Sequence, residues 1–284
     1  MKRALALVPL ALLLVVATGC GAKDTLDLDP VANAASKTTE AGSSRVTYEM
    51  TLSGGGQKLS FDATGIFAYD ELRGSMTMDM SSLPGAGVGK FEVRMVGSMM
   101  YVRGSELFSG ADALPAGKEW ASFDIDKSLD AAGLGGLDMS QLDQDPVQTL
   151  RLLRASSARV TKAGTARVRG VETTRYKATL DLEQALAATV GELELDEQQR
   201  KGLRAAAEDL RKQTGLTSVP VEVFVDGDGL LRRYTMTMAT PIEGEQVKMT
   251  MTTDYFDFGV DVDVKAPPAD AVFDMTDEIT SAGG

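Results

Sequence analysis

Apolar and polar side chains alternate strictly along most of the chain from about residue 45 onward. In residues 46–52, for example, Val, Tyr, Met and Leu alternate with Thr, Glu and Thr. A period of two is typical of antiparallel strands that have one buried and one solvated face. The pattern predicts strands over residues 45–52, 59–69, 75–80, 91–95, 99–102, 120–124, 159–162, 165–169, 173–180, 219–225, 230–238 and 247–255.

Helix-start signals separate these strands into groups. Asp29-Pro30 predicts a helix through Glu40 that stops at Gly42, because Asp is a good N-cap and Pro suits the first helical position. Asp145-Pro146 repeats this signal, and capping boxes at Asp181 and Asp196 predict helices to about residues 189 and 213. The last helix carries a stripe of Leu203, Ala207 and Leu210, and residues 127–143 are expected to form a loop. The chain is therefore predicted to be α+β, with a large curved antiparallel sheet and helices packed on one face.

The N-terminus has the pattern of a secretory signal peptide. Lys2 and Arg3 precede the apolar run of residues 4–16, and Ala-Thr-Gly-Cys follows at residues 17–20. Thirteen apolar residues are too few for a membrane-spanning helix, which needs about 20. Cys20 is the only cysteine and stands where a bacterial lipobox places its lipidated residue, although position −3 is Ala17 and not leucine. We expect cleavage before Cys20 and a diacylglyceryl anchor on its thiol.

These signals predict the layout and location of the chain. Residues 1–19 are expected to be the signal peptide, 20–28 a lipidated tether, 29–274 a single α+β domain, and 275–284 a frayed tail. The net charge is −12, or −14 without Lys2 and Arg3, which argues against nucleic acid as a partner. We therefore expect a lipid-anchored protein on the extracytoplasmic face of the cell membrane.

The sequence offers no sign of catalysis. It contains no histidine, no Gly-x-Ser-x-Gly elbow, no phosphate-binding glycine loop and no zinc-ligand spacing. Asp226-Gly-Asp-Gly229 resembles the start of a calcium loop, but Leu and Arg follow where further oxygen ligands are needed, so a hairpin turn is predicted. We expect no enzyme activity, no cofactor and no metal site.

The fourteen methionines are numerous for a chain with few aromatic residues, and many fall on predicted strand faces. One interpretation is an ordinary core, because methionine fills irregular gaps. A second is an apolar cavity between sheet and helices, with a flexible lining suited to acyl chains. A third and weaker one is copper(I) bound by the thioethers of Met76, Met78 and Met80. The candidate cavity lining is Met50, Met78, Met95, Tyr234, Met236, Met238, Met249 and Met251.

Several segments together resemble the LppX/LprA/LprF/LprG lipoprotein family of actinobacteria. They are the lipobox, the helix from Pro30, the strand and turn of residues 221–230, and the ending Tyr-Phe-Asp-Phe-Gly at 255–259 with Val-Asp-Val-Lys-Ala-Pro-Pro at 262–268. The resemblance implies a half-barrel sheet with helices on its concave face. It also implies a cavity that holds the acyl chains of glycolipids or acylglycerols and a role in moving them.

Two functions from different classes remain open at this point. The chain is a lipid or hydrophobic-ligand carrier if the space between sheet and helices holds an apolar cavity. It is an interaction or sensor module that docks on another envelope protein if that space is filled, with Met78, Met236 and Met251 packed against the Leu203 stripe.

Overall fold

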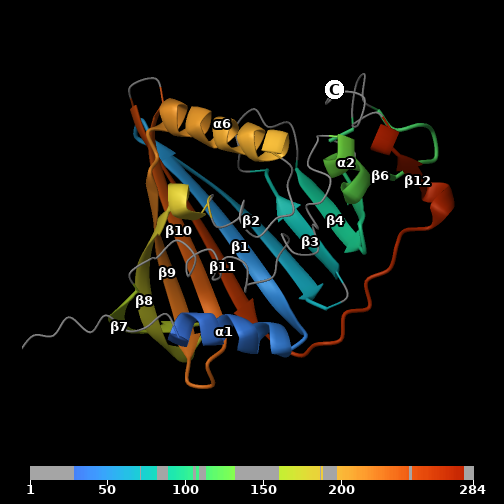
Figure 1. The fold of residues 1–284 in the computed structure, drawn as a ribbon. Coiled ribbons are helices and arrows are strands. Elements are labelled where there is room, and N and C mark those ends of the chain that lie inside the picture. The colour runs from blue at the N-terminus through green and yellow to red at the C-terminus, as the bar shows by residue number, and fades with distance from the viewer. Residues whose placement is uncertain are drawn as a thin grey trace, which may run out of the picture.

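The computed structural model describes residues 29–70, 72–81, 89–104, 107–108, 113–131, 160–185, 187, 197–242 and 245–277. The predicted signal peptide, Cys20 and the tether lie outside these residues, as does the helix predicted from Asp145. All described strands belong to one open sheet (Figure 1). Its strand order is β12-β6-β5-β4-β3-β2-β1-β11-β10-β9-β8-β7.

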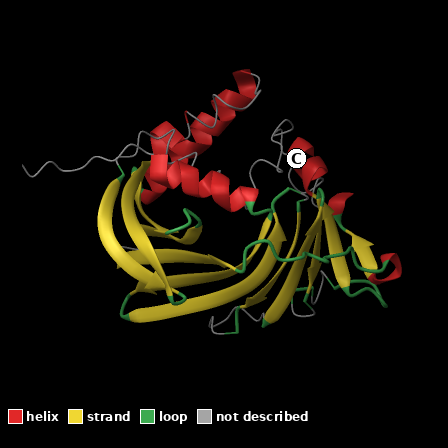
Figure 2. Cartoon of the chain, turned by 90° about the horizontal axis from the view of Figure 1, so that it is seen from below, coloured by secondary structure: helices red, strands yellow, loops and turns green. Residues whose placement is uncertain are grey.

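The strands follow the alternation closely. Their bounds are β1 Ser43–Gly54, β2 Gln57–Ala68, β3 Arg73–Asp79, β4 Lys90–Val96, β5 Met99–Arg103, β6 Trp120–Asp124, β7 Thr161–Val168, β8 Val171–Asp181, β9 Ser218–Asp226, β10 Leu231–Ile242, β11 Glu245–Phe256 and β12 Val272–Asp274. Neighbouring strands pair antiparallel except β12, which pairs parallel with β6. The sheet is strongly curved, and the helices lie on its concave side (Figure 2). The predicted α+β class with helices on the concave face is confirmed.

The helices are α1 Asp29–Glu40, α2 Ile125–Ala131 and α6 Glu197–Thr214, with a 3₁₀ turn, η2, at Ala269–Ala271. In α1, Val31, Ala34, Ala35 and Thr38 are buried, at the spacing of one helical face. The Leu231 N–H donates to Thr38 Oγ1 over 2.9 Å, which ties α1 to β10. The helix ends at Glu40, and Gly42 follows two residues later with a φ of +77°, which suits glycine.

Four sequence predictions need correction. The strands expected at 159–162 and 165–169 are one strand, β7, with a bulge between Lys162 and Thr165. The loop expected from residue 127 begins as α2, and Asp124 caps that helix by accepting the Lys127 N–H over 3.3 Å. The proline pair at residues 267–268 predicts an end of regular structure, but η2 and β12 follow it. The first residues of the tail also pack, since Thr276 is buried and accepts the Asp124 N–H over 3.0 Å.

The main core lies between α1 and the β8–β10 part of the sheet. Val219, Val221 and Val223 of β9 are each 1% exposed, and they pack with Val31, Ala34 and Ala35 of α1. Tyr234, Met236 and Met238 of β10 are partly buried against this cluster. The sheet is therefore firmly covered at one side of its concave face.

We expect Gly74→Ala to lower the free energy of unfolding by about 2 kcal/mol, because overpacking a filled site forces side chains to move. A Cβ at Gly74 would collide with the ring of Phe67, which is 5% exposed, and would lie 2.9 Å from the Ile66 carbonyl oxygen. The matched control is Gly202→Ala in α6, where a Cβ meets nothing within 4 Å and helix propensity favours alanine. Urea unfolding measures both variants, and equal stability of the two would contradict the prediction.

Candidate functional site

A methionine-rich surface occupies the middle of the concave sheet face. Strand register sets it in rows that cross the strands. One row is Met236, Met251, Met50 and Phe61, and the next is Met238, Met249, Leu52 and Leu59. A third row is Tyr234, Thr253, Tyr48, Ala63, Met78 and Phe91. We call the following set the methionine face: Tyr48, Met50, Leu52, Leu59, Phe61, Met78, Tyr234, Met236, Met238, Met249, Met251 and Thr253.

Every residue of the methionine face is half-buried. This differs from the neighbouring β9 positions on the same side of the sheet, where the valines are almost completely buried under α1. The residues of the methionine face on β11, β1 and β2 are thus less buried than the valines of β9, although Ala63 of β2 is only 2% exposed. A half-buried apolar surface of this extent is unusual outside a binding or interaction site.

The methionine face carries no charge. None of its members is acidic or basic, and the same holds for the other concave-face positions of β1, β2, β3 and β4. In β11, Glu245 at the start of the strand falls in the same alternation as Met249 and Met251. Because the described strands place no lysine or arginine in these rows, the surface disfavours anionic groups.

Tyr48 and Tyr234 supply the main polar atoms of the methionine face. Burial raises the pKa of both phenols, so each hydroxyl stays protonated across the physiological range. The Tyr234 hydroxyl donates to the sulfur of Met236 at 3.9 Å, which is a weak acceptor. The Tyr48 ring lies 6.3 Å from the ring of Phe61 in a tilted arrangement. Both tyrosines therefore lean toward the row of Met236, Met251 and Met50.

The structure brings seven of the eight predicted lining residues together on the methionine face: Met50, Met78, Tyr234, Met236, Met238, Met249 and Met251. Met95 is on the same side of the sheet but is only 8% exposed, next to Gly74 and Met100. The sequence did not single out Tyr48, Leu52 or Phe61. They could have been found by extending the alternation across paired strands.

Three further groups of residues were singled out in the sequence: the methionines of β3, the stripe of α6 and the turn after β9. Met76 and Met78 share the concave side of β3, and Met80 follows the strand. The side chains of Leu203, Ala207 and Leu210 lie outside the part that the structure describes, so their expected packing stays a prediction. The turn at 226–229 is a hairpin turn, because the Asp226 carboxylate accepts the N–H groups of Asp228 and Leu230.

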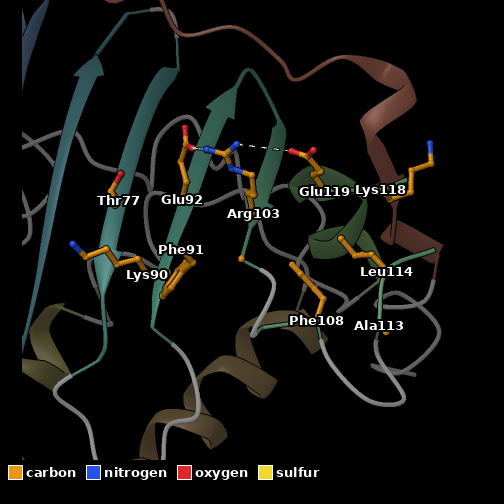
Figure 3. Close-up of a pocket in the computed structure, with 11 residues that line it drawn as sticks. Thr77, Lys90, Phe91, Glu92, Arg103, Phe108, Ala113, Leu114, Lys118 and Glu119 are labelled. Atoms are coloured by element: carbon orange, nitrogen blue, oxygen red, sulfur yellow. Dashed lines mark hydrogen bonds and ion pairs between the residues drawn. The ribbon is translucent and has the colours of Figure 1, made fainter. Parts of the chain in front are cut away.

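A separate pocket of about 640 Å³ lies beside β3, β4 and the β5–β6 connection (Figure 3). Its charged wall holds Glu92, which accepts from Arg103 at 2.6 Å and from Arg94 at 2.7 Å. Both guanidiniums also lie over the ring of Trp120, at 4.5 and 4.9 Å from its centroid. The apolar part of the lining includes Phe91, Phe108 and Leu114, which lie below Glu92 and Arg103 in the view.

The pocket contains none of the predicted lining residues. Thr77, Glu92 and Arg103 alternate with concave-face residues and so point to the opposite side of the sheet. Sequence reasoning missed it because its wall depends on how the β5–β6 connection folds back. Its carboxylates and guanidiniums mainly satisfy one another, which makes it a weaker candidate than the methionine face.

The described residues hold no group of three or more His, Cys, Asp or Glu side chains placed to bind a metal ion. Among the described helices, none has the length and apolar character needed to cross a membrane.

Comparison with known proteins finds similarity to a protein described as a lipoprotein. It is 25% identical over 256 residues to "Putative lipoprotein SCO4650" of Streptomyces coelicolor, covering 87% of this chain and 74% of that one. The chain is similar to bacterial lipoproteins. The resemblance to lipoproteins expected from the sequence is thus found in the comparison.

Further similarities are shorter or lower in identity. The chain is 28% identical over 180 residues to "Uncharacterized 31.2 kDa protein in rplA-rplJ intergenic region" of Streptomyces griseus, covering 61% of this chain and 54% of that one. Similar solved structures include the Mycobacterium tuberculosis lipoprotein LppX, with 14% identity, a TM-score of 0.46, and 84% of this chain and 97% of that one covered. LprF from Mycobacterium bovis has 11% identity and a TM-score of 0.41, with 85% and 97% covered. No family model matches the chain.

Proposed function

We propose that this chain is an extracytoplasmic lipoprotein that binds the acyl chains of lipids on its methionine face. In this proposal a diacylglyceryl group on Cys20 anchors it to the cell membrane, and the lipid or glycolipid ligand comes from that membrane. The chain is a binding protein and not an enzyme. An envelope protein partner would take over the ligand if the role is transfer.

The observation that carries the proposal is the charge-free, half-buried methionine face. An acyl chain lying along it covers apolar surface on both sides, and each buried CH₂ contributes about 0.8 kcal/mol. Methionine side chains have flexible, polarizable thioethers that adapt to chains of different shape. The similarity to a protein described as a lipoprotein supports the anchored location.

We expect Met251→Lys to weaken acyl-chain binding by at least about tenfold, because an ammonium without a counter-charge would sit in an apolar contact. Met251 is suited to this test because it pairs with Met50 on one side and Met236 on the other. The measurement is displacement of an uncharged fluorescent acyl-ester probe from the chain that starts at residue 20, with Cys20→Ser.

The matched control is Thr250→Lys, one residue earlier in β11. Thr250 pairs with Thr51 and Thr237 on the opposite side of the sheet. The affinity of the Thr250→Lys variant for the acyl probe should therefore equal that of the unchanged chain. Thermal unfolding of both variants establishes that they fold. Equal affinities for Met251→Lys and the unchanged chain would place the ligand elsewhere and reject the proposal.

A further inference from the structure

We propose that the methionine face selects uncharged lipids that carry a hydrogen-bond acceptor, such as an ester carbonyl, over both ionised fatty acids and plain hydrocarbons. This inference rests on the proposed function and deepens it. Tyr48, Thr253 and Tyr234 are assigned as the residues that recognise the acceptor.

The first observation is the row that these residues form. Thr253 of β11 pairs directly with Tyr48 of β1 and with Tyr234 of β10, so three residues that carry hydroxyl groups are neighbours across adjacent strands. Apolar rows lie on both sides of them. Met236, Met251 and Met50 form one such row, and Val46 and Tyr255 begin the other. A ligand lying along the strands would place a polar junction at the hydroxyls and apolar segments beyond it.

The second observation is that the hydroxyl groups of Tyr48 and Tyr234 can each donate a hydrogen bond to a ligand. The only acceptor that Tyr234 has among the described residues is the sulfur of Met236, which is a weak one. The Tyr48 ring contacts Phe61, an apolar neighbour. An ester or hydroxyl oxygen would be a better acceptor than a thioether, and a hydrogen bond formed there contributes about 1 kcal/mol.

The third observation is the missing charge. A carboxylate or phosphate placed at the hydroxyl row would find no lysine or arginine at the concave-face positions of the described strands β1, β2, β10 and β11. An ionised group without a partner in an apolar contact is strongly unfavourable. The phenols remain protonated because burial raises their pKa, so they act as donors and do not add a negative charge. An uncharged acceptor is therefore preferred.

The test uses the full chain, lipid-anchored in phosphatidylcholine nanodiscs, and three photoreactive probes of equal length. The probes are a methyl hexadecanoate, a hexadecanoate and a hexadecane, each with a diazirine on the chain. Labelling is compared between variants for one probe at a time, so that partition into the membrane cancels. Labelled peptides are mapped to identify the surface that each probe occupies.

We expect Tyr234→Phe and Tyr48→Phe each to reduce labelling by the ester about fivefold, the effect of one lost hydrogen bond, and to leave labelling by hexadecane unchanged. Tyr101→Phe is the control, because Tyr101 pairs with Arg94 on the opposite side of the sheet. Thr253→Arg should shift the preference from the ester to hexadecanoate, since it supplies the missing cation.

The outcomes separate the two proposals. Equal losses for ester and hexadecane would mean that the tyrosines only shape the surface, and unchanged ester labelling would mean that they make no contact; either result overturns the inference. If no probe labels peptides of β1, β10 or β11 even in the unchanged chain, the proposed function fails as well.

Discussion

Replacing Asp226 by Ala should lower the free energy of unfolding by about 4 kcal/mol, the largest loss we expect from a single substitution in this chain. Its side chain is only 3% exposed and receives the Arg232 Nε–H at 2.5 Å. The same carboxylate accepts the N–H groups of Asp228 and Leu230 at 3.0 and 2.9 Å. Alanine would leave a guanidinium that is 18% exposed without its anion and two turn amides without an acceptor.

The control for this prediction lies two residues away. Asp228 is an exposed carboxylate in the same turn, and its main-chain oxygen, not its carboxylate, accepts from Lys37. Asp228→Ala should therefore change stability by no more than about 0.5 kcal/mol. Urea unfolding followed by circular dichroism gives both values. A loss for Asp226→Ala no larger than that for Asp228→Ala would show that the turn is held by other contacts.

Sequence reasoning predicted the parts of the fold that depend on local pattern. Alternation gave the strands and also their faces, because a period of two puts Met50 and Met251 on one side whatever the curvature of the sheet. The start of α1 at Asp29 and the cap at Asp181 were predicted because helix-start signals are short-range; in the structure, Asp181 accepts the Gln184 N–H over 3.0 Å.

Features that depend on distant parts of the chain were not predicted. The β7 bulge changes the phase of the apolar and polar alternation at Gly164, whose φ is +95°. The sequence pattern therefore predicts two strands where the structure has one. The segment after Gly259 first passes β3, where Arg73 donates a hydrogen bond to the Val264 carbonyl. It then reaches the edge of the sheet, where β12 pairs with β6. No pattern within residues 260–277 reveals a contact with Arg73 or Trp120.

The candidate site was predicted as a set of residues but not as a surface. Sequence indicates which side chains share a face, whereas their exposure depends on what covers them. Val223 and Tyr234 are direct neighbours across β9 and β10, yet the first is almost fully buried and the second half-buried. Val223 packs in the cluster that includes α1, whose position depends on tertiary contacts such as Thr38 to Leu231.

Affinity for the methionine face should rise roughly 200-fold from an octanoate ester to a dodecanoate ester. The four added methylene groups contribute about 0.8 kcal/mol each, or about 3 kcal/mol together. The rise should be nearly the same at about 0.05 M and about 0.5 M salt, because salt screens charge interactions and the methionine face has none. Competition against a fluorescent acyl probe measures the series.

Two further measurements decide whether this dependence belongs to the methionine face. Met251→Lys should flatten the rise with chain length, because the added ammonium interrupts the row between Met236 and Met50. Thr250→Lys should preserve it. If affinity instead falls with salt and does not depend on chain length, the ligand is held by its head group. The charged wall at Arg103 and Glu92 would then be the surface to examine, because its guanidinium and carboxylate groups would respond to salt in that way.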